Sequence, residues 1–151
     1  MCIVISNKRG FTLVELLVVL VLIAILALIS FPQFDRVVQE YKLDTDARQL
    51  AWVLRSARQE AITSGHTQRV IFNITKGQYS KGGNRYTLSP NINFVGTTSF
   101  RLIEGVPICG FTVSGAPTPQ AGAATLENKY GSQISVIVNI ATGRIRVQEQ
   151  L

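Results

Sequence analysis

The sequence has few of the side chains that enzymes use for chemistry. It contains one histidine, His66, and two cysteines, Cys2 and Cys109. It has no glycine-rich phosphate loop, no nucleophile elbow and no Ser, His and Asp set from which a catalytic triad could be assembled. We therefore expect neither an enzyme nor a bound metal or cofactor. His66 is expected to be a turn residue.

Glycine and proline are missing from a long apolar segment, Phe11 to Phe31. This segment carries one charged residue, Glu15, and Pro32 follows it. A helix of about 20 apolar residues spans roughly 30 Å, the thickness of a bilayer's hydrocarbon core. We predict a membrane-spanning helix over residues 11–33, ended or kinked near Pro32. The basic residues before it place the N-terminus in the cytoplasm and the rest of the chain outside.

The apolar segment differs from a secretory signal peptide. Such a signal is cleaved after its apolar core, whereas the plausible processing site here, Gly10–Phe11, precedes the core. A plain single-pass anchor is the alternative. Glu15 argues against it, because a carboxylate one turn inside a spanning helix is costly and is usually functional and paired. The one partner that the sequence offers is the α-amino group that cleavage after Gly10 creates on Phe11.

This combination resembles the class III signal of type IV pilins and type II secretion pseudopilins, over the segment KRGFTLVELLVVLVLIAILALISFP. The resemblance implies that a prepilin peptidase cuts after Gly10 and methylates the new N-terminal Phe11. It also implies that Glu15 is needed for assembly and that Pro32 kinks the helix. The implied precursor is a single-pass protein of the cytoplasmic (inner) membrane with an extracytoplasmic globular domain. It joins sister pilins or pseudopilins in a filament.

Length and charge limit what remains after a leader of residues 1–10. Of the 151 residues, about 115 remain beyond the membrane helix, enough for one small domain. The net charge of +6 falls to +4 when Lys8 and Arg9 leave. This modest basic excess fits nucleic acid, an acidic partner or an ordinary basic surface. Cys2 also leaves, so Cys109 has no disulfide partner and is expected to be a small buried hydrophobe.

The remaining chain shows a helical period followed by a strand period. Apolar residues recur every three or four positions over residues 34–64, which predicts an amphipathic helix ending at Ser64–Gly65. Its small residues Ala51, Ala57 and Ala61 should let a sheet approach closely. Residues 65–151 then predict a β-rich domain of about six or seven short strands, with a loop at residues 115–124. The expected fold is α+β and pilin-like, a long N-terminal helix packed on antiparallel sheets.

The C-terminal hairpin places two arginines on one face of a strand. In the alternating sequence Arg144, Ile145, Arg146, Val147, the two guanidinium groups are roughly 7 Å apart by strand rise. That is close to the spacing of successive phosphates, to which arginine is well suited. The alternative is a solvated strand face whose arginines protect a sheet edge from aggregation.

The segments QRVIF, FTVSGAPT and ISVIVNIATGRIRV resemble the GspH/FimT family of H-type minor pseudopilins and T-type minor pilins. The resemblance implies a structural subunit of a type II secretion pseudopilus or type IV pilus. In T-type members a GRxR motif is associated with DNA binding during natural transformation, and here it reads Gly143, Arg144, Ile145, Arg146. DNA uptake is therefore the alternative function. The other basic residues are scattered along the sequence, without the interleaved aromatics that stack bases.

Overall fold

The structure, a computed structural model, describes residues 11–96 and 98–150, without the side chains of residues 28–33 and 150. The predicted leader, with the proposed cleavage residue Gly10, lies outside these residues. The chain divides into two compact units, Met1–Asp35 and Arg36–Leu151.

A single helix, α1, covers Leu13–Ser64, a length of 52 residues. The two helical segments predicted on either side of Pro32 are thus one element in its backbone hydrogen bonding. The side chain of Pro32 lies outside the description, so the kink stays a prediction. The helix ends where the sequence predicted, because Gly65 follows with φ of 66°, a left-handed conformation that glycine adopts without strain.

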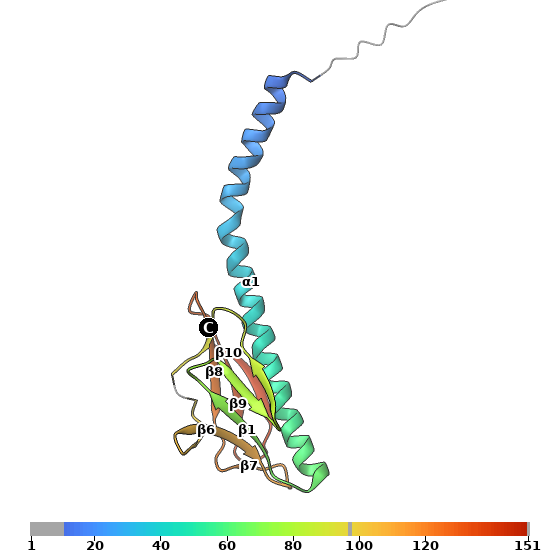
Figure 1. Ribbon diagram of the computed structural model, residues 1–151, viewed down its shortest axis with the longest axis vertical. Helices are drawn as coiled ribbons and strands as arrows, with labels where there is room; N and C mark the ends of the chain where they lie inside the picture. Colours follow the sequence, from blue (N-terminus) through green and yellow to red (C-terminus); the bar gives the residue numbers. More distant parts are fainter. Residues whose placement is uncertain (1–10, 97, 151) are drawn as a thin grey trace, which may run out of the picture. The chain divides into compact units, whose positions relative to one another are not determined.

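Two antiparallel sheets follow the helix (Figure 1). The larger sheet has the strand order β3-β2-β1-β6-β5, with β7 paired to β6, and the smaller one has the order β10-β9-β8-β4. The strands of the larger sheet are β1 (Gln68–Asn73), β2 (Gln78–Lys81), β3 (Asn84–Thr87), β5 (Leu102–Ile103), β6 (Val106–Phe111) and β7 (Pro117–Thr118). Those of the smaller sheet are β4 (Ile92–Phe94), β8 (Ala123–Asn128), β9 (Gln133–Val138) and β10 (Ile145–Gln150).

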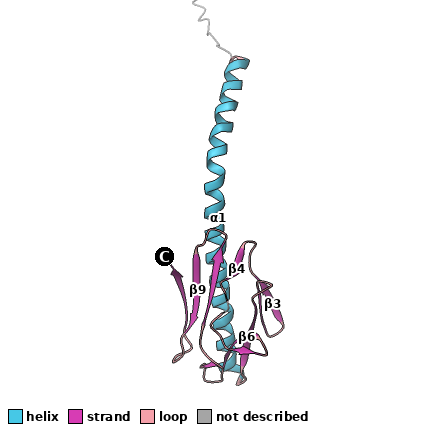
Figure 2. Cartoon of the chain, turned by 90° about the vertical axis from the view of Figure 1, so that its left-hand side faces the viewer, coloured by secondary structure: helices cyan, strands magenta, loops and turns pink. Residues whose placement is uncertain are grey.

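The core of the second unit lies between α1 and the sheets (Figure 2). The predicted small residues Ala51, Ala57 and Ala61 are fully buried, as is the neighbouring Leu54. From the sheet side, Phe72 stacks on Phe100 with ring centroids 5.2 Å apart. Such aromatic burial contributes about 0.5–1.5 kcal/mol per pair beyond the area removed from water. The predicted α+β fold, with a long N-terminal helix followed by antiparallel sheets, is therefore confirmed.

The number of strands was underestimated. The described residues form ten strands, and two of them overlap the predicted loop at residues 115–124. The strand β8 was missed because its sequence, AATLEN, has few β-branched or aromatic residues. It is a strand because β4 and β9 pair with it on either side, and this tertiary pairing outweighs its weak local preference.

A buried carboxylate ties α1 to the segment between β3 and β4. Asp46 Oδ2 accepts a hydrogen bond from the Ser89 backbone N–H at 2.7 Å, and Oδ1 accepts one from the Ser89 hydroxyl at 3.1 Å. Burial raises the pKa of Asp46, and the two hydrogen bonds from Ser89 and the charge of Lys42 oppose that shift only in part. The helix is thus fixed to the sheet region by a polar contact as well as by its apolar face.

Candidate functional site

The N-terminal end of α1 carries two of the residues predicted to act in processing and assembly. Phe11 is 80% exposed and precedes the helix. The Thr12 hydroxyl accepts a hydrogen bond from the Glu15 backbone N–H at 3.2 Å. Thr12 therefore caps the helix, in the T-x-x-E arrangement of a capping box. Glu15 is the acidic residue of the first turn, where the helix dipole favours a negative charge. Sequence reasoning missed the capping role of Thr12.

Around this helical segment the apolar side chains are exposed on every side. Large hydrophobic residues from Leu13 to Leu26 all have about half or more of their surface accessible. A helix that is apolar all round is stable when another apolar phase or other helices cover it. Within the residues searched, no helix has an apolar stretch long enough to cross a membrane. The predicted span of residues 11–33 includes residues 28–33, whose side chains lie outside the description.

In the second unit, the β9–β10 hairpin places its arginines as the alternation predicted. Ile145 is buried, whereas Arg144 and Arg146 on either side of it are exposed. The strand β10 is an end strand of its sheet and pairs with β9. Arg146 lies in this end strand, and Arg144 directly precedes it.

The turn of this hairpin is rigidly built around Asn139. Its side-chain oxygen accepts hydrogen bonds from the backbone N–H groups of Ala141 and Thr142, at 2.9 and 3.2 Å. The turn ends at Gly143, which has φ of 63° and is buried. A Cβ at Gly143 would collide with the backbone oxygen of Gly115. The glycine before Arg144 is therefore required both by its backbone conformation and by a close backbone contact.

Arg58 on α1 joins the two turns that meet at this contact. Its Nε donates to the Gly115 carbonyl at 3.0 Å, and its Nη2 donates to the Thr142 carbonyl at 3.1 Å. One turn earlier on the helix, Arg55 Nη2 donates to the Ile145 carbonyl of β10 at 3.3 Å. These bonds fasten the arginine-bearing hairpin to α1.

A groove of about 440 Å³ lies between α1 and the hairpin. The helix contributes Trp52, Arg55, Ser56, Arg58 and Gln59, and the hairpin contributes Arg144 and Ile145. The ion pairs in the described part of the chain include Arg36–Glu40, Arg48–Asp44 and Lys81–Glu60. Among the residues that the structure describes, no carboxylate forms an ion pair with Arg55, Arg58 or Arg144, so their positive charges are not neutralised.

The sequence did not reveal this groove. The basic residues predicted to be scattered do not line this groove, whose arginines come from α1 and the hairpin. Trp52 lies far from Arg144 in the sequence, and the packing of α1 on the β-domain brings both to one groove. A signal was present in the helical spacing of Trp52, Arg55, Ser56 and Gln59, which places them on one helix face.

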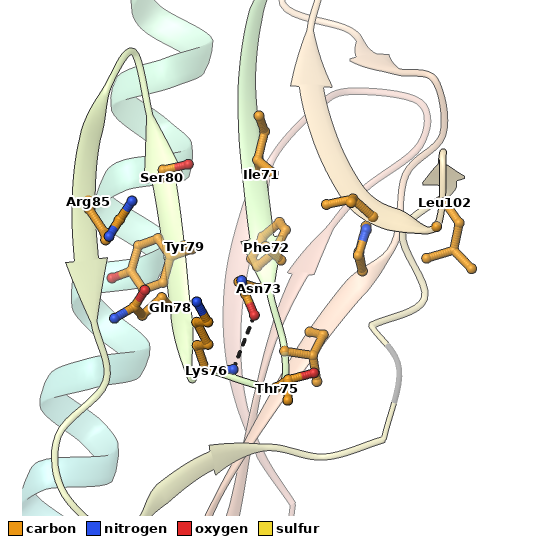
Figure 3. Close-up of a pocket in the computed structure, with 14 residues that line it drawn as sticks. Ile71, Phe72, Asn73, Thr75, Lys76, Gln78, Tyr79, Ser80, Arg85 and Leu102 are labelled. Atoms are coloured by element: carbon orange, nitrogen blue, oxygen red, sulfur yellow. Dashed lines mark hydrogen bonds between the residues drawn. The ribbon is translucent and has the colours of Figure 1, made fainter.

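A second groove, of about 640 Å³, lies on the outer face of the larger sheet (Figure 3). The partly exposed side chains of Ile71, Leu102 and Val106 form its apolar part. Lys76 and Arg85 add positive charge, and the Lys76 backbone N–H donates to Asn73 Oδ1 at 3.1 Å. The lining contains no carboxylate or histidine that could act as a general base.

The two residues considered as reactive groups have structural positions. Cys109 is free and buried, and burial raises the pKa of its thiol to about 12, so the thiol stays protonated at neutral pH. The prediction of a small buried hydrophobe is thus confirmed. His66 is exposed just past the helix end, with its Nδ1 2.8 Å from the Ser64 carbonyl oxygen. It is a turn residue, as predicted.

Comparison with known proteins bears on both the N-terminal segment and the fold. The prokaryotic N-terminal methylation motif matches residues 5–31. No curated protein sequence matches the chain. The fold is similar to that of the minor pseudopilin EpsH from the type 2 secretion system of Vibrio cholerae, with a TM-score of 0.57 and 19% identity. That match covers 72% of this chain and 97% of EpsH.

The fold is also similar to that of the type IV minor pilin FimU of Pseudomonas aeruginosa. The TM-score is 0.52 at 14% identity, and the match covers 75% of this chain and 91% of FimU. The chain therefore combines the methylation motif of prokaryotic prepilins with the fold of minor pseudopilins and minor pilins. This confirms the predicted pilin-like fold and the N-terminal methylation motif.

Proposed function

We propose that this chain is a minor subunit of a type II secretion pseudopilus or a type IV pilus, and not an enzyme. One observation carries the proposal: the N-terminal methylation motif leads directly into α1, whose second half packs on a domain with the fold of EpsH and FimU. In this role a prepilin peptidase cuts after Gly10, and Phe11 becomes the methylated N-terminus. The helix holds the subunit in the cytoplasmic membrane until sister subunits take it into the filament.

In this function the residues at the start of α1 act in assembly. The Glu15 carboxylate pairs with the Phe11 ammonium group of the same or a neighbouring subunit. An ion pair in an apolar surrounding is costly unless it is matched, so it selects register more than it adds stability. The exposed apolar side chains from Leu13 to Leu26 then pack against the helices of sister subunits.

The processing step has a direct test. Mass spectrometry of the protein extracted from membranes should find an N-terminus at Phe11 that carries one methyl group. The matched control is Gly10→Val, which should retain the N-terminus at Met1. An intact Met1 in the unmodified protein, in a strain with active prepilin peptidase, would refute the pilin function.

DNA capture is a second candidate function, and the hairpin geometry favours it. Arg144 and Arg146 are exposed on either side of the buried Ile145, and neither forms an ion pair with a carboxylate in the described residues. Their spacing along a strand, roughly 7 Å, suits successive phosphates. This function would make the chain a DNA-binding minor pilin.

The two candidates differ in their salt dependence. If the hairpin binds DNA, affinity falls steeply with salt, and the Arg144→Ala, Arg146→Ala double variant reduces the slope of log affinity against log salt by about two. The matched control is Arg69→Ala, Arg85→Ala, which removes two exposed positive charges from the larger sheet. Equal effects of the two double variants would mean that net charge, and not the hairpin, attracts DNA.

A further inference from the structure

Trp52 gives the groove beside Arg144 a feature that arginines alone do not provide. Its side chain is 60% exposed, although tryptophan is the largest apolar side chain and the core of the same helix is nearby. It is also the one tryptophan of the sequence. Its indole lines the groove together with Arg55, Arg58 and Arg144. An exposed flat ring and three positive charges thus border the same space.

The arginines of this groove are positioned but remain charged. Arg55 and Arg58 donate to the backbone carbonyls of Ile145, Gly115 and Thr142, which orient the guanidinium groups without neutralising them. Each guanidinium has five N–H donors, so the bonds to carbonyls leave others available. The three carbonyls belong to turns and a strand end that the same contacts hold in place. The positive charge is therefore preorganised, which lowers the entropic cost of binding an anion.

The ligand chemistry that fits is an anion joined to a flat ring. Phosphates suit arginine, and nucleic acid bases stack on exposed aromatic side chains. The groove, at about 440 Å³, is within the range of about 300–1,000 Å³ typical of ligand sites. A duplex keeps the faces of its bases stacked inside the helix, whereas a single strand presents them.

We propose that this groove is a binding site for single-stranded nucleic acid, in which one base stacks on Trp52 and the flanking phosphates contact Arg55 and Arg144. The inference rests on the second candidate function and adds a preference for single strands over duplex. Arg58 keeps the hairpin seated, and Arg146 extends the positive surface along β10.

The experiment uses the full chain in neutral detergent micelles and a fluorescein-labelled oligothymidylate of about 12 nucleotides, a length within the usual range of single-strand sites. Affinity is measured by anisotropy, and the intrinsic fluorescence of Trp52 is recorded in parallel. Because the chain has one tryptophan, any quenching reports on this site. A duplex of the same length is measured under the same salt conditions.

The expected results separate stacking from charge. Binding quenches Trp52, and Trp52→Ala weakens oligothymidylate binding by about 5- to 150-fold, as expected for the loss of one stacked base. Trp52→Tyr retains most of the affinity, and duplex binding changes little. The control Tyr41→Ala removes an exposed aromatic of the same helix outside the groove and should have no effect.

Other outcomes overturn the inference in distinguishable ways. Unchanged oligothymidylate affinity in Trp52→Ala, or binding without quenching, excludes stacking on Trp52. If Arg144→Ala, Arg146→Ala still abolishes binding in that case, the second candidate function stands without this site. If Trp52→Ala binds DNA normally but no longer assembles into filaments, the indole of Trp52 acts in packing between subunits and not in DNA binding. Failure of the unmodified chain to bind either DNA refutes both this site and the second candidate function.

Discussion

Replacing Gly143 by alanine should destabilise the domain more than its backbone conformation alone would require. An L-residue in the left-handed region costs about 1–2 kcal/mol, and Gly143 has φ of 63°. In addition, the new Cβ would collide with the Gly115 backbone oxygen, so one of the two turns must move. Arg58 bonds to carbonyls of both turns, and moving either turn breaks at least one bond. A hydrogen bond from a charged donor contributes about 1.5–3 kcal/mol, so the total loss should be about 2.5–5 kcal/mol.

Gly65 provides a control for the conformational part. Its φ is 66°, and an added Cβ there meets no atom within 4 Å. The variant Gly65→Ala should therefore lose about 1–2 kcal/mol from backbone strain alone. The assay is urea unfolding of the full chain in detergent micelles, followed by Trp52 fluorescence. Equal losses in the two variants, within about 0.5 kcal/mol, would show that the hairpin turn is not seated on Gly115.

A double-variant cycle identifies the contact that is lost. The Arg58→Ala variant already lacks the hydrogen bonds from Arg58 to the Gly115 and Thr142 carbonyls, which we call the Arg58 clamp. In this variant, Gly143→Ala should reduce the free energy of unfolding by about 1–3 kcal/mol less than it does in the unmodified chain. If the two substitutions have additive effects on the free energy of unfolding, the hydrogen bonds of Arg58 do not depend on the contact between the hairpin turn and Gly115. The result also matters for function, because a Gly143 variant that fails to bind DNA can fail through a displaced Arg144.

Two further predictions concern polar contacts of the core. Burial raises the pKa of Asp46 above its ordinary value of 3.8, so the folded state holds the proton more tightly and loses stability as pH rises through the raised pKa. Urea unfolding at about pH 3 and pH 7 should show Asp46→Asn gaining stability relative to the unmodified chain on going to pH 7, and a constant difference contradicts this. Lys81 Nζ, in a side chain 14% exposed, lies 2.7 Å from Glu60 Oε2 and 2.6 Å from Ser56 Oγ. Glu60→Ala should cost about 1–3 kcal/mol because it leaves a nearly buried ammonium without its counter-charge, and Lys81→Met should cost less because Glu60 is half exposed. The reverse order in thermal unfolding would contradict this reasoning.

The parts of the fold that depend on local periodicity could be predicted from the sequence. Ala51, Ala57 and Ala61 recur on one helical face, and all three are buried against the β-domain. Arg144, Ile145 and Arg146 alternate as a strand requires, and the two arginines are exposed on either side of a buried isoleucine. In each case one short segment is enough for the prediction. The side chains on one face of a helix or strand recur every 3.6 or 2 residues, so the sequence of that segment alone shows which residues share a face.

The candidate site depends on contacts between segments that are distant in the sequence, and hydrophobic periodicity does not predict such contacts. Arg58 bonds to Gly115 and Thr142, and the sequence contains no sign that those two turns meet. The groove around Trp52 arises from the position of α1 along the β-domain, which the summed packing of the core decides. The strand β8 was missed for the same reason, since β4 and β9 impose its conformation.

The clamp made by Arg58 has a mechanical consequence. The strand β10 lies at the end of its sheet and pairs with β9. A force applied at Arg144 acts on the turn of the hairpin, where it would break the hydrogen bonds between β10 and β9 one after another. Arg58 bonds to Thr142 beside that turn, and Arg55 bonds to the Ile145 carbonyl next to Arg144. Tension applied at Arg144 is therefore transferred to α1 at the turn and divided between several bonds. A load applied at this surface would pass into α1 and leave the end strand paired with β9.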